Sequence, residues 1–394
     1  MDRIALIHEW FTAIAGSERV VEQVCGLYAS AEIYTVFADP ASVAQTDWLR
    51  GRQIHTSFIQ GLPRAAKSYR SYLPLMPLAV EQFDLSAYDL VISSNHAVAK
   101  GVLTGPDQLH ISYVHSPIRY AWDLQHQYLR ESGLDQGAKG WIAKWLLHKM
   151  RIWDYRTAAG VDHFVANSAF IARRIRKVYG RNADVIYPPV DVAAFTKHEQ
   201  KDTYYLAASR LVPYKKMDLI VETFSAMPEQ RLLVVGDGPD MAKIRAKAGP
   251  NIELLGFQPK AALCDLMQRA RAFVFAAEED FGITPVEAQA CGTPVIAFGK
   301  GGALETVVPP GRADTPATGL FFDVQTPESL SEAVRQFAAA RDRFEPQACR
   351  MNAERFSNER FRSEFSAYVA ERMARHRAGE RESHTAASGA IAAR

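Results

Sequence analysis

Short runs of β-branched and other apolar residues alternate with helical stretches along most of the chain, and this alternation constrains the fold most. The run at 3–8 precedes a helical stretch at 17–28, and the run at 161–168 leads into another at 169–180. Strands separated by helices form parallel sheets covered on both faces. The first half of the chain is therefore expected to form a Rossmann-like sheet.

The Pro188-Pro189 pair ends this first series, and the same alternation starts again after it. Proline fixes its own φ angle and cannot continue a helix, so the pair indicates a rigid crossing point. Later runs indicate strands of a second sheet. We therefore predict an α/β fold of two Rossmann-like domains whose parallel sheets face each other across a cleft. The predicted parts are domains at 1–188 and 189–355, a helix at 356–375 packing back toward the first domain, and a disordered tail at 376–394.

Composition excludes several classes of protein. The 394 residues are 48% hydrophobic, which suffices for two cores, and a net charge of +2 gives no support for nucleic-acid binding. There is no run of eighteen apolar residues to span a membrane, and the start does not resemble a secretion signal. The four cysteines are scattered without metal-site spacing, as expected for reduced thiols. We predict a cytoplasmic location.

The segment 278–305 has the composition of a ligand site at the edge of a sheet. It holds two carboxylates, Glu279 and Glu287, separated by seven residues, and a glycine cluster follows them. Ligands of open parallel sheets bind beyond the carboxyl ends of the strands, where this segment is expected to lie. Glu279 therefore points into the cleft or is an ordinary solvated loop carboxylate.

A helix is expected to begin near residue 284. Thr284 is a good N-cap, Pro285 suits the first turn, and Glu287 falls three residues after the cap, which makes a capping box. The alternative for Glu287 is ligand binding. Free backbone N–H groups at 282–286, except at Pro285, which has none, would form an electropositive end suited to a phosphate, and Gly282 would let a ligand approach closely.

The motifs, taken in order, resemble a known family. The segment from Glu279 to Glu287, "EDFGITPVE", followed by "AQACGTPVIAFGKGGALE", is similar to the E-x7-E region of retaining glycosyltransferases of family four. The resemblance covers nearly the whole chain and ends before the tail. It implies the GT-B fold and a nucleotide-sugar donor, and it is nearest to mannosyltransferases of bacterial surface-polysaccharide assembly. The other matching motifs are "GSER" at 16–19, "VHSPIRYAWD" at 114–123, "ANS" at 166–168, "YPPVD" at 187–191 and "SRLVPYKKMD" at 209–218.

The resemblance implies that the domain at 189–355 binds the donor and the domain at 1–188 the acceptor. Arg210 and Lys215 would grip the diphosphate, the first bidentately and the second as a point charge; a salt bridge within the domain is the alternative for Arg210. Glu287 would bind the ribose hydroxyls, and Glu279 the donor sugar or its anomeric region. Backbone amides would face the phosphates or the sugar from Phe281, Gly282, Ile283 and Thr284.

Further site residues come from other loops. Gly16 and Ser17 start a helix directly after the first strand and would face the diphosphate. Gly236, in the turn "GDGP", would line the same cleft. His115 would hydrogen-bond the donor sugar or approach the reacting centre; the alternative is a core histidine. Arg19 and Arg119 would assist with the acceptor or with phosphate.

No Asp-x-Asp pair, which usually holds the ion in metal-dependent sugar transfer, occurs in the chain. We therefore predict that no metal and no other cofactor is needed, with cations and helix ends stabilising the leaving group. The resemblance further implies GDP-mannose as the donor and retention of the anomeric configuration. Retention would follow from front-face attack, with the leaving phosphate accepting the acceptor's proton.

Two stretches, 50–82 and 139–156, interleave basic residues with aromatic and apolar ones. Such faces suit an anionic membrane surface and would serve an enzyme with a glycan or lipid-linked acceptor. The alternative is a core-facing helix with a solvated basic side. We predict peripheral contact with the inner face of the membrane.

Three other functions compete with sugar transfer. A sugar-nucleotide epimerase of the same architecture would act on the donor without any acceptor. A non-catalytic binding protein would have lost some of the four site residues Arg210, Lys215, Glu279 and Glu287, yet all are present. An NAD oxidoreductase would carry G-x-G-x-x-G after its first strand, and this chain does not.

Overall fold

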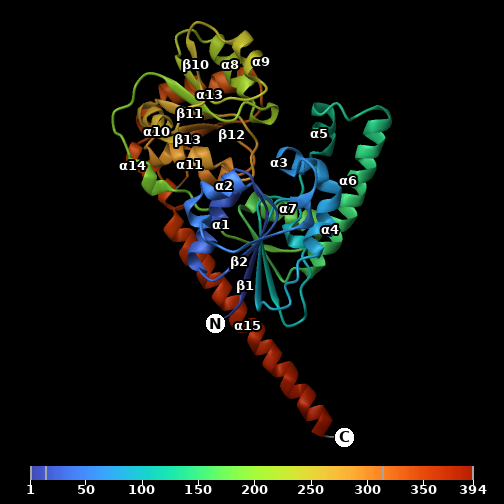
Figure 1. Ribbon diagram of the computed structural model, residues 1–394. Coiled ribbons are helices and arrows are strands. Elements are labelled where there is room, and N and C mark those ends of the chain that lie inside the picture. The colour runs from blue at the N-terminus through green and yellow to red at the C-terminus, as the bar shows by residue number, and fades with distance from the viewer. Residues whose placement is uncertain (1, 14–15, 313–314, 393–394) are drawn as a thin grey trace. The chain divides into compact units, whose positions relative to one another are not determined.

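The computed structural model describes residues 2–13, 16–312 and 315–392, with side chains described up to residue 379 (Figure 1). The chain divides into two compact units. Unit 1 comprises Met1–Pro188 together with Phe361–Arg394, and unit 2 comprises Pro189–Arg360. The division falls within the Pro188-Pro189 pair, where the strand and helix alternation is interrupted.

Unit 1 contains a seven-stranded, fully parallel sheet with the strand order β3-β2-β1-β4-β5-β6-β7. The order reverses direction between β1 and β4, and this switch point opens a crevice at the carboxyl ends of the two strands. The strands are β1 Ile4–Phe11, β2 Glu32–Ala38, β3 Ile54–Thr56, β4 Leu90–Asn95, β5 Leu109–Val114, β6 His163–Ala166 and β7 Ala183–Val185.

Helices cover both faces of this sheet, so most strand residues are buried whichever way they point (Figure 1). On one face, α1 (Gly16–Leu27) and α15 (Asn358–Ala392) share a core with Leu6 and its neighbours. On the other face, Ile7 shares a core with α4 (Met76–Glu81) and α6 (Gly137–Thr157). The remaining helices of this unit are α2 Pro40–Ala44, α3 Ala65–Ser68, α5 Gln125–Glu131 and α7 Ala169–Tyr179.

Helix α15 returns the end of the chain to unit 1. Phe361, Phe365, Val369 and Met373, four residues apart, lie in the core that α1 also enters. The tail was expected to be disordered from residue 376, but the structure differs, because α15 continues to Ala392. The tail is rich in alanine, and extension of a packed helix avoids the cost of a new nucleus.

Unit 2 contains a six-stranded parallel sheet of order β10-β9-β8-β11-β12-β13, with its switch point between β8 and β11. Helices α8, α9 and α13 share a core with one face, and Figure 1 shows α10, α11 and α14 on the other side. The strands are β8 Tyr205–Ala208, β9 Leu232–Val235, β10 Ile252–Gly256, β11 Ala272–Phe275, β12 Val295–Phe298 and β13 Gly319–Phe322. The helices are α8 Met217–Ser225, α9 Met241–Lys247, α10 Lys260–Arg269, α11 Ile283–Ala290, α12 Ala303–Thr306, α13 Pro327–Ala339 and α14 Pro346–Glu354. The prediction of two Rossmann-like domains is confirmed.

Candidate active site

In unit 2, the predicted cations and carboxylate meet at the switch point. Arg210 and Lys215 follow β8, and Glu279 follows β11. Lys215 forms an ion pair with Glu279, and the two side chains are 19% and 18% exposed. Arg210 is exposed and forms no ion pair within the described part of the chain, so the salt-bridge alternative finds no partner there. The family resemblance implied separate roles for Lys215 and Glu279 and did not predict their pairing.

Helix α11 begins earlier than the sequence predicted. Its N-cap is Gly282 at a φ of +87°, without a side-chain capping bond, and Ile283 is its first residue. The expected capping box is therefore wrong, since Thr284 lies inside the first turn and Glu287 beyond it. The reason is the left-handed turn at Gly282, which only glycine adopts without strain and which starts the helix sooner. Glu287 is half-buried and lies beyond the first turn of α11.

The glycine cluster after β12 is explained by the loop that carries Glu279. The backbone N–H of Gly302 donates to the carbonyl of Glu279 at 2.8 Å. A Cβ on Gly301 would lie 2.3 Å from that carbonyl oxygen, and one on Gly302 would lie 2.3 Å from the Cα of Phe281. Both contacts are shorter than any side chain tolerates, so these glycines let the two loops touch.

The Arg210 loop is held in a similar way by the turn after β9. A Cβ on Gly236 would lie 1.8 Å from the carbonyl oxygen of Ser209, and Gly236 has a φ of +139°. Its main role in this structure is close packing against the backbone beside Arg210. The predicted ligand contact of Gly236 stays a prediction.

The buried side-chain amides of Gln289 and Asn352 hold α11 in place. Gln289 donates to the carbonyls of Pro285 and Thr306 at 3.1 and 2.9 Å, and it accepts from Asn352 of α14 at 2.6 Å. The ring of Phe281 packs edge-on against Phe356 with centroids 5.3 Å apart. These contacts position α11 within unit 2.

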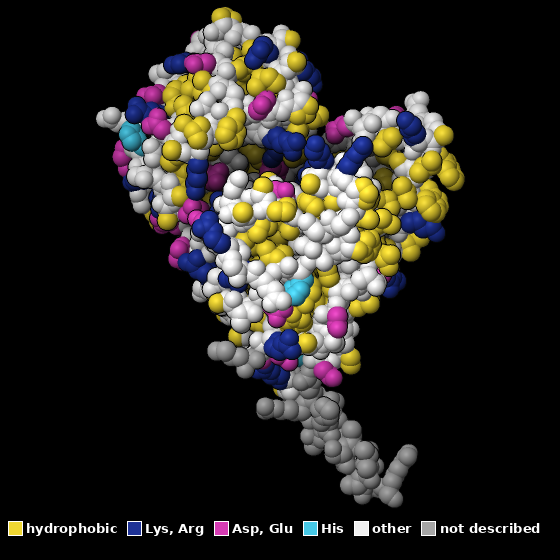
Figure 2. Space-filling model, in the orientation of Figure 1, with side chains coloured by type: hydrophobic (Ala, Val, Ile, Leu, Met, Phe, Trp, Pro, Cys, Tyr) yellow, Lys and Arg dark blue, Asp and Glu magenta, His cyan; other side chains and the backbone are white. Residues whose placement is uncertain are grey.

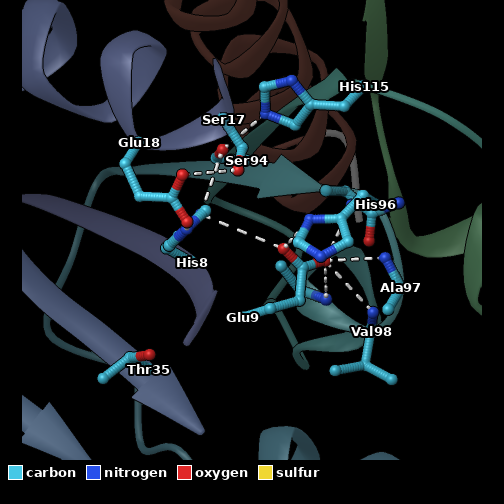
Figure 3. Close-up of polar contacts among 12 residues, drawn as sticks. His8, Glu9, Ser17, Glu18, Thr35, Ser94, His96, Ala97, Val98 and His115 are labelled. Atoms are coloured by element: carbon cyan, nitrogen blue, oxygen red, sulfur yellow. Dashed lines mark hydrogen bonds and ion pairs between the residues drawn. The ribbon is translucent and has the colours of Figure 1, made fainter. Parts of the chain in front are cut away.

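In unit 1, the switch point holds a fully buried carboxylate, Glu9 of β1 (Figure 3). Its Oε1 atom accepts from four consecutive backbone N–H groups after β4, at 2.8 to 3.3 Å, and its Oε2 atom lies 2.9 Å from Nδ1 of His96. Burial opposes the charge of Glu9, but the interactions with His96 outweigh it and lower the pKa far below its ordinary value. The same pairing raises the pKa of His96 against burial. The four donors belong to His96, Ala97, Val98 and Ala99.

A chain of hydrogen bonds joins Ser17 to His115 beside this pair (Figure 3). Ser17 donates to Glu18 at 3.0 Å, Glu18 lies 3.3 Å from Nε2 of His8, and Nδ1 of His8 lies 3.2 Å from the hydroxyl of Ser94. That hydroxyl lies 2.8 Å from Nε2 of His115. Burial lowers the pKa of His115 to about 3, so its imidazole is neutral at physiological pH.

The sequence predicted Ser17 and His115 and missed the groups between them. Gly16 is the first residue of α1, directly before Ser17, as expected. The side chain of Asn167 donates to the backbone carbonyl of His115 at 3.0 Å and fixes the end of β5. Arg19 forms an ion pair with Glu22, one helical turn away, at 2.9 Å.

Arg119 lies in the loop after β5, where its Nε is 3.4 Å from the hydroxyl of Ser116. Among the described residues, no group of three or more His, Cys, Asp or Glu side chains is arranged to hold a metal ion. Nor does any helix in the described ranges combine the length and apolar character needed to cross a membrane.

Comparison with known families agrees with this geometry. The model of Glycosyltransferase Family 4 matches residues 14–194, and that of Glycosyl transferases group 1 matches residues 192–356. The chain belongs to glycosyltransferase family four. The two matches follow one another along the chain and together span the strands of both sheets.

Curated relatives are more distant and match in part. A GDP-mannose-dependent monoacylated alpha-(1-6)-phosphatidylinositol monomannoside mannosyltransferase of Corynebacterium glutamicum is 32% identical over 44% of this chain and 51% of its own length. A D-inositol 3-phosphate glycosyltransferase of Thermomonospora curvata is 28% identical over 56% of this chain and 63% of its own length. The chain thus spans about half the length of the first of these relatives.

Solved structures share the fold along nearly the whole chain. Anabaena HepE, solved with UDP and glucose, has a TM-score of 0.65 at 16% identity and covers 94% of this chain and 100% of its own. Sucrose-phosphate synthase of Thermosynechococcus elongatus has a TM-score of 0.69 at 18% identity and covers 95% and 100%. At this identity the likeness concerns the fold alone, and it identifies the two Rossmann-like units as the GT-B architecture.

Proposed function

We propose that the protein is a retaining glycosyltransferase that moves a hexose, mannose from GDP-mannose, to a glycan or lipid-linked acceptor in polysaccharide biosynthesis. The observation that carries this proposal is the Lys215–Glu279 ion pair at the switch point of unit 2, next to the start of α11. The name of the Corynebacterium relative supports the choice of GDP-mannose and mannose. Family membership supports the reaction class.

Sugar transfer leaves a nucleoside diphosphate, so the enzyme must stabilise negative charge on the leaving oxygens. The ammonium of Lys215 has three N–H donors, and its pairing with Glu279 leaves others to bind a phosphate oxygen. Arg210 would add a bidentate contact, because its guanidinium is exposed and has no ion-pair partner among the described residues. The N–H groups that begin α11 would supply further positive potential.

The carboxylates would bind the neutral parts of the donor. Glu287 would accept hydrogen bonds from the two ribose hydroxyls, and Glu279, oriented by Lys215, would accept from a hydroxyl of the sugar. No carboxylate is assigned as a nucleophile, so retention would come from front-face attack in which the leaving phosphate takes the acceptor's proton. His115 would act in its neutral form, as a hydrogen-bond partner and not as a charge.

We further propose that transfer needs no metal ion, since the cations and the helix start would do the work of a divalent ion. The protein would act in the cytoplasm, where nucleotide sugars are made, with peripheral contact to the membrane through unit 1. Exposed Trp141 and Trp145 on α6, 69% and 48% exposed, support such a contact.

A thermal-shift screen tests donor binding. GDP-mannose, UDP-glucose and ADP-glucose would be compared on the wild type and on Lys215→Ala. At one hundred times its dissociation constant a ligand adds about 2.7 kcal/mol to stability, so the true donor is expected to raise Tm by several degrees in the wild type and by less in the variant. Equal shifts in both proteins would contradict the role of Lys215.

Incubation of the preferred donor without acceptor then separates transfer from epimerisation. A transferase is expected to leave the donor largely intact until an acceptor is added. Formation of an epimer, or of the free epimeric sugar, in the absence of acceptor would replace this proposal with the epimerase. Absence of any donor binding would favour a non-catalytic protein.

A further inference from the structure

Unit 1 contains a cavity of about 770 Å³ between the polypeptide around α4 and helices α5 and α6. It reaches the switch point of the sheet, because Trp10 of β1 and His96 after β4 form part of its wall. His96 also pairs with Glu9, so the cavity adjoins the buried polar cluster. A volume of this size lies in the range of about 300–1,000 Å³ found for pockets that enclose a small-molecule ligand.

The wall of the cavity is mostly apolar, and the larger part of it comes from the two stretches predicted to face a membrane. Residues 50–82 and 139–156 lie far apart in the sequence, and the structure brings both to this cavity. Figure 2 shows hydrophobic side chains gathered over the part of unit 1 that carries α5 and α6, with Lys and Arg side chains around them. The apolar lining residues are Trp10, Leu73, Pro74, Met76, Pro77, Leu129, Leu134, Ala143, Leu146, Leu147, Met150 and Trp153.

The charged residues of the wall are all basic. Arg70 and Lys149 line the cavity, and no aspartate or glutamate among the described residues does so. Both are exposed, and neither has an ion-pair partner in the described part of the chain; each lies over an aromatic ring instead, Arg70 over Tyr69 and Lys149 over Trp145. An apolar interior with unpaired cations is complementary to an amphiphile that joins a hydrocarbon chain to an anion.

The shape of the cavity is built into the fold. Trp153 is oriented by a hydrogen bond from its indole N–H to Glu81 at 2.7 Å, and a Cβ on Gly101 would lie 2.2 Å from its ring. The next residue, Asp154, forms a fully buried ion pair with Lys100 at 2.8 Å. These contacts hold the end of α6 in place, so the apolar wall does not close by a small shift of the helix.

We propose that this cavity binds the hydrocarbon chain of a lipid-linked acceptor, while Arg70 and Lys149 bind the acceptor's phosphate. The inference rests on the proposed function, since it takes unit 1 to be the acceptor side, and it selects the lipid-linked class from the two acceptor classes. It also explains the mixed composition of the two stretches. Trp153 and Lys149 face the cavity, whereas Trp141 and Ile152 are more than half exposed and do not line it.

The test measures binding of alkyl phosphates from butyl to dodecyl by calorimetry, below their micelle concentrations and without vesicles. Each methylene that enters the cavity is expected to lower Kd by up to about fourfold, the equivalent of about 0.8 kcal/mol, until the cavity is full. Beyond that length Kd is expected to level off. A steady fall without a plateau, or no dependence on chain length, would overturn the proposal.

Two pairs of variants on α6 sharpen the result. Ala143→Phe fills the cavity and is expected to remove the dependence on chain length, whereas Ala138→Phe, on an exposed position outside the lining, keeps it. Lys149→Glu is expected to weaken every alkyl phosphate by about tenfold and leave alkanols unchanged, whereas Lys139→Glu, with the same change of charge outside the lining, has little effect. If both members of a pair behave alike, the cavity is not the binding site.

Other occupants give different outcomes. Binding only to anionic vesicles, with no effect of Ala143→Phe, would make the region a membrane surface. Dimerisation that Ala143→Phe abolishes would make it an interface between two copies. Either result overturns the proposal. The thermal shift with GDP-mannose reports separately on unit 2: alkyl phosphate binding without donor binding would contradict the proposed function alone, and the reverse would contradict the cavity alone.

Discussion

The two polar sites of this molecule are built in opposite ways. At the switch point of unit 2, Lys215 and Glu279 pair on loops at which both side chains still reach solvent. At the switch point of unit 1, Glu9 lies on a strand with no exposure at all and is satisfied by four N–H groups and His96. A partly exposed pair can exchange one partner for a ligand at lower cost, whereas a buried carboxylate cannot lose a partner without penalty.

Charged residues of the same types therefore have different structural roles in the two units. In unit 2 the charges are accessible, and the stability of the loops comes from glycine contacts and the amides under α11. In unit 1 the polar groups are themselves part of the core. Substitutions at the unit 2 site should therefore lower activity without lowering stability. Substitutions at the unit 1 site should lower stability.

The largest effect is expected for Glu9→Ala. Removal of this carboxylate leaves His96 and four backbone N–H groups without their acceptor, which for a buried pair costs about 3–5 kcal/mol. All six tryptophans lie in unit 1, so urea unfolding followed by tryptophan fluorescence measures this unit alone. Glu22→Ala, which breaks only a surface pair with Arg19, is the control and should cost less than about 1 kcal/mol. Similar losses in both variants would contradict the contrast.

The unit 2 site was more predictable from the sequence than the unit 1 site, and the reason is physical. Arg210, Lys215, Glu279 and Glu287 occur in two short segments, each directly after a strand, so local pattern together with the family resemblance selected them, and their contacts with a donor stay predictions. Local pattern did not predict the ion pair between Lys215 and Glu279 or the residue at which α11 begins. The start of α11 depends on the turn at Gly282, and that turn depends on the contacts of its own loop.

The unit 1 cluster depends on contacts between strands distant in sequence. Glu9 meets the backbone at 96–99, and Ser94 connects His8 to His115, so no single segment contains the site. One signal was present: the strand at 4–11 is apolar except for an adjacent His-Glu pair, and a buried strand does not carry such groups without partners. The two predicted domains, by contrast, followed from periodicity alone.

The second largest effect is expected for the cations of unit 2. Lys215→Ala or Arg210→Ala should lower sugar transfer by about a hundredfold or more, because each removes a group that stabilises the leaving diphosphate. Tm should stay within about two degrees of the wild type, since both side chains reach solvent and neither belongs to the core. Lys216→Gly is the matched control, because it removes the neighbouring charge at a backbone φ of +56° that suits glycine. Near-normal turnover in Lys215→Ala and Arg210→Ala would remove the diphosphate contacts from the proposal.

A smaller loss is expected for Glu287→Gln. The amide keeps the size of the side chain but turns a charge-assisted hydrogen bond into a neutral one of about half the strength. Donor affinity should fall by about ten- to thirtyfold, or 1–2 kcal/mol, with Tm unchanged. Calorimetry with GDP-mannose measures the affinity, and an unchanged dissociation constant would rule out the ribose contact.

The pH dependence of stability distinguishes the contribution of charge from that of packing in unit 1. Because pairing with Glu9 raises the pKa of His96, its contribution to stability is full below the ordinary value of 6.5 and is lost as pH rises through the raised value. The contribution of Glu9, whose pKa is lowered from 4.5, is constant above that value. The stability advantage of the wild type over Glu9→Gln should therefore be greater at about pH 6 than at about pH 9. An advantage that grows with pH would show that His96 is not charged in the folded protein.

The smallest effect is expected for removal of metal ions. This experiment tests whether the cations of unit 2 stabilise the leaving diphosphate without a divalent ion. The proposal assigns charge stabilisation to Lys215, Arg210 and the start of α11, so EDTA should leave the rate of transfer almost unchanged in the wild type. The informative comparison is Lys215→Ala with and without Mg²⁺. Added Mg²⁺ should restore little of the activity that Lys215→Ala loses, because among the described residues no group of carboxylates is arranged to hold the ion. Complete loss of wild-type activity with EDTA, recovered by Mg²⁺ or Mn²⁺, would mean that the ion, and not the Lys215–Glu279 pair, carries the charge.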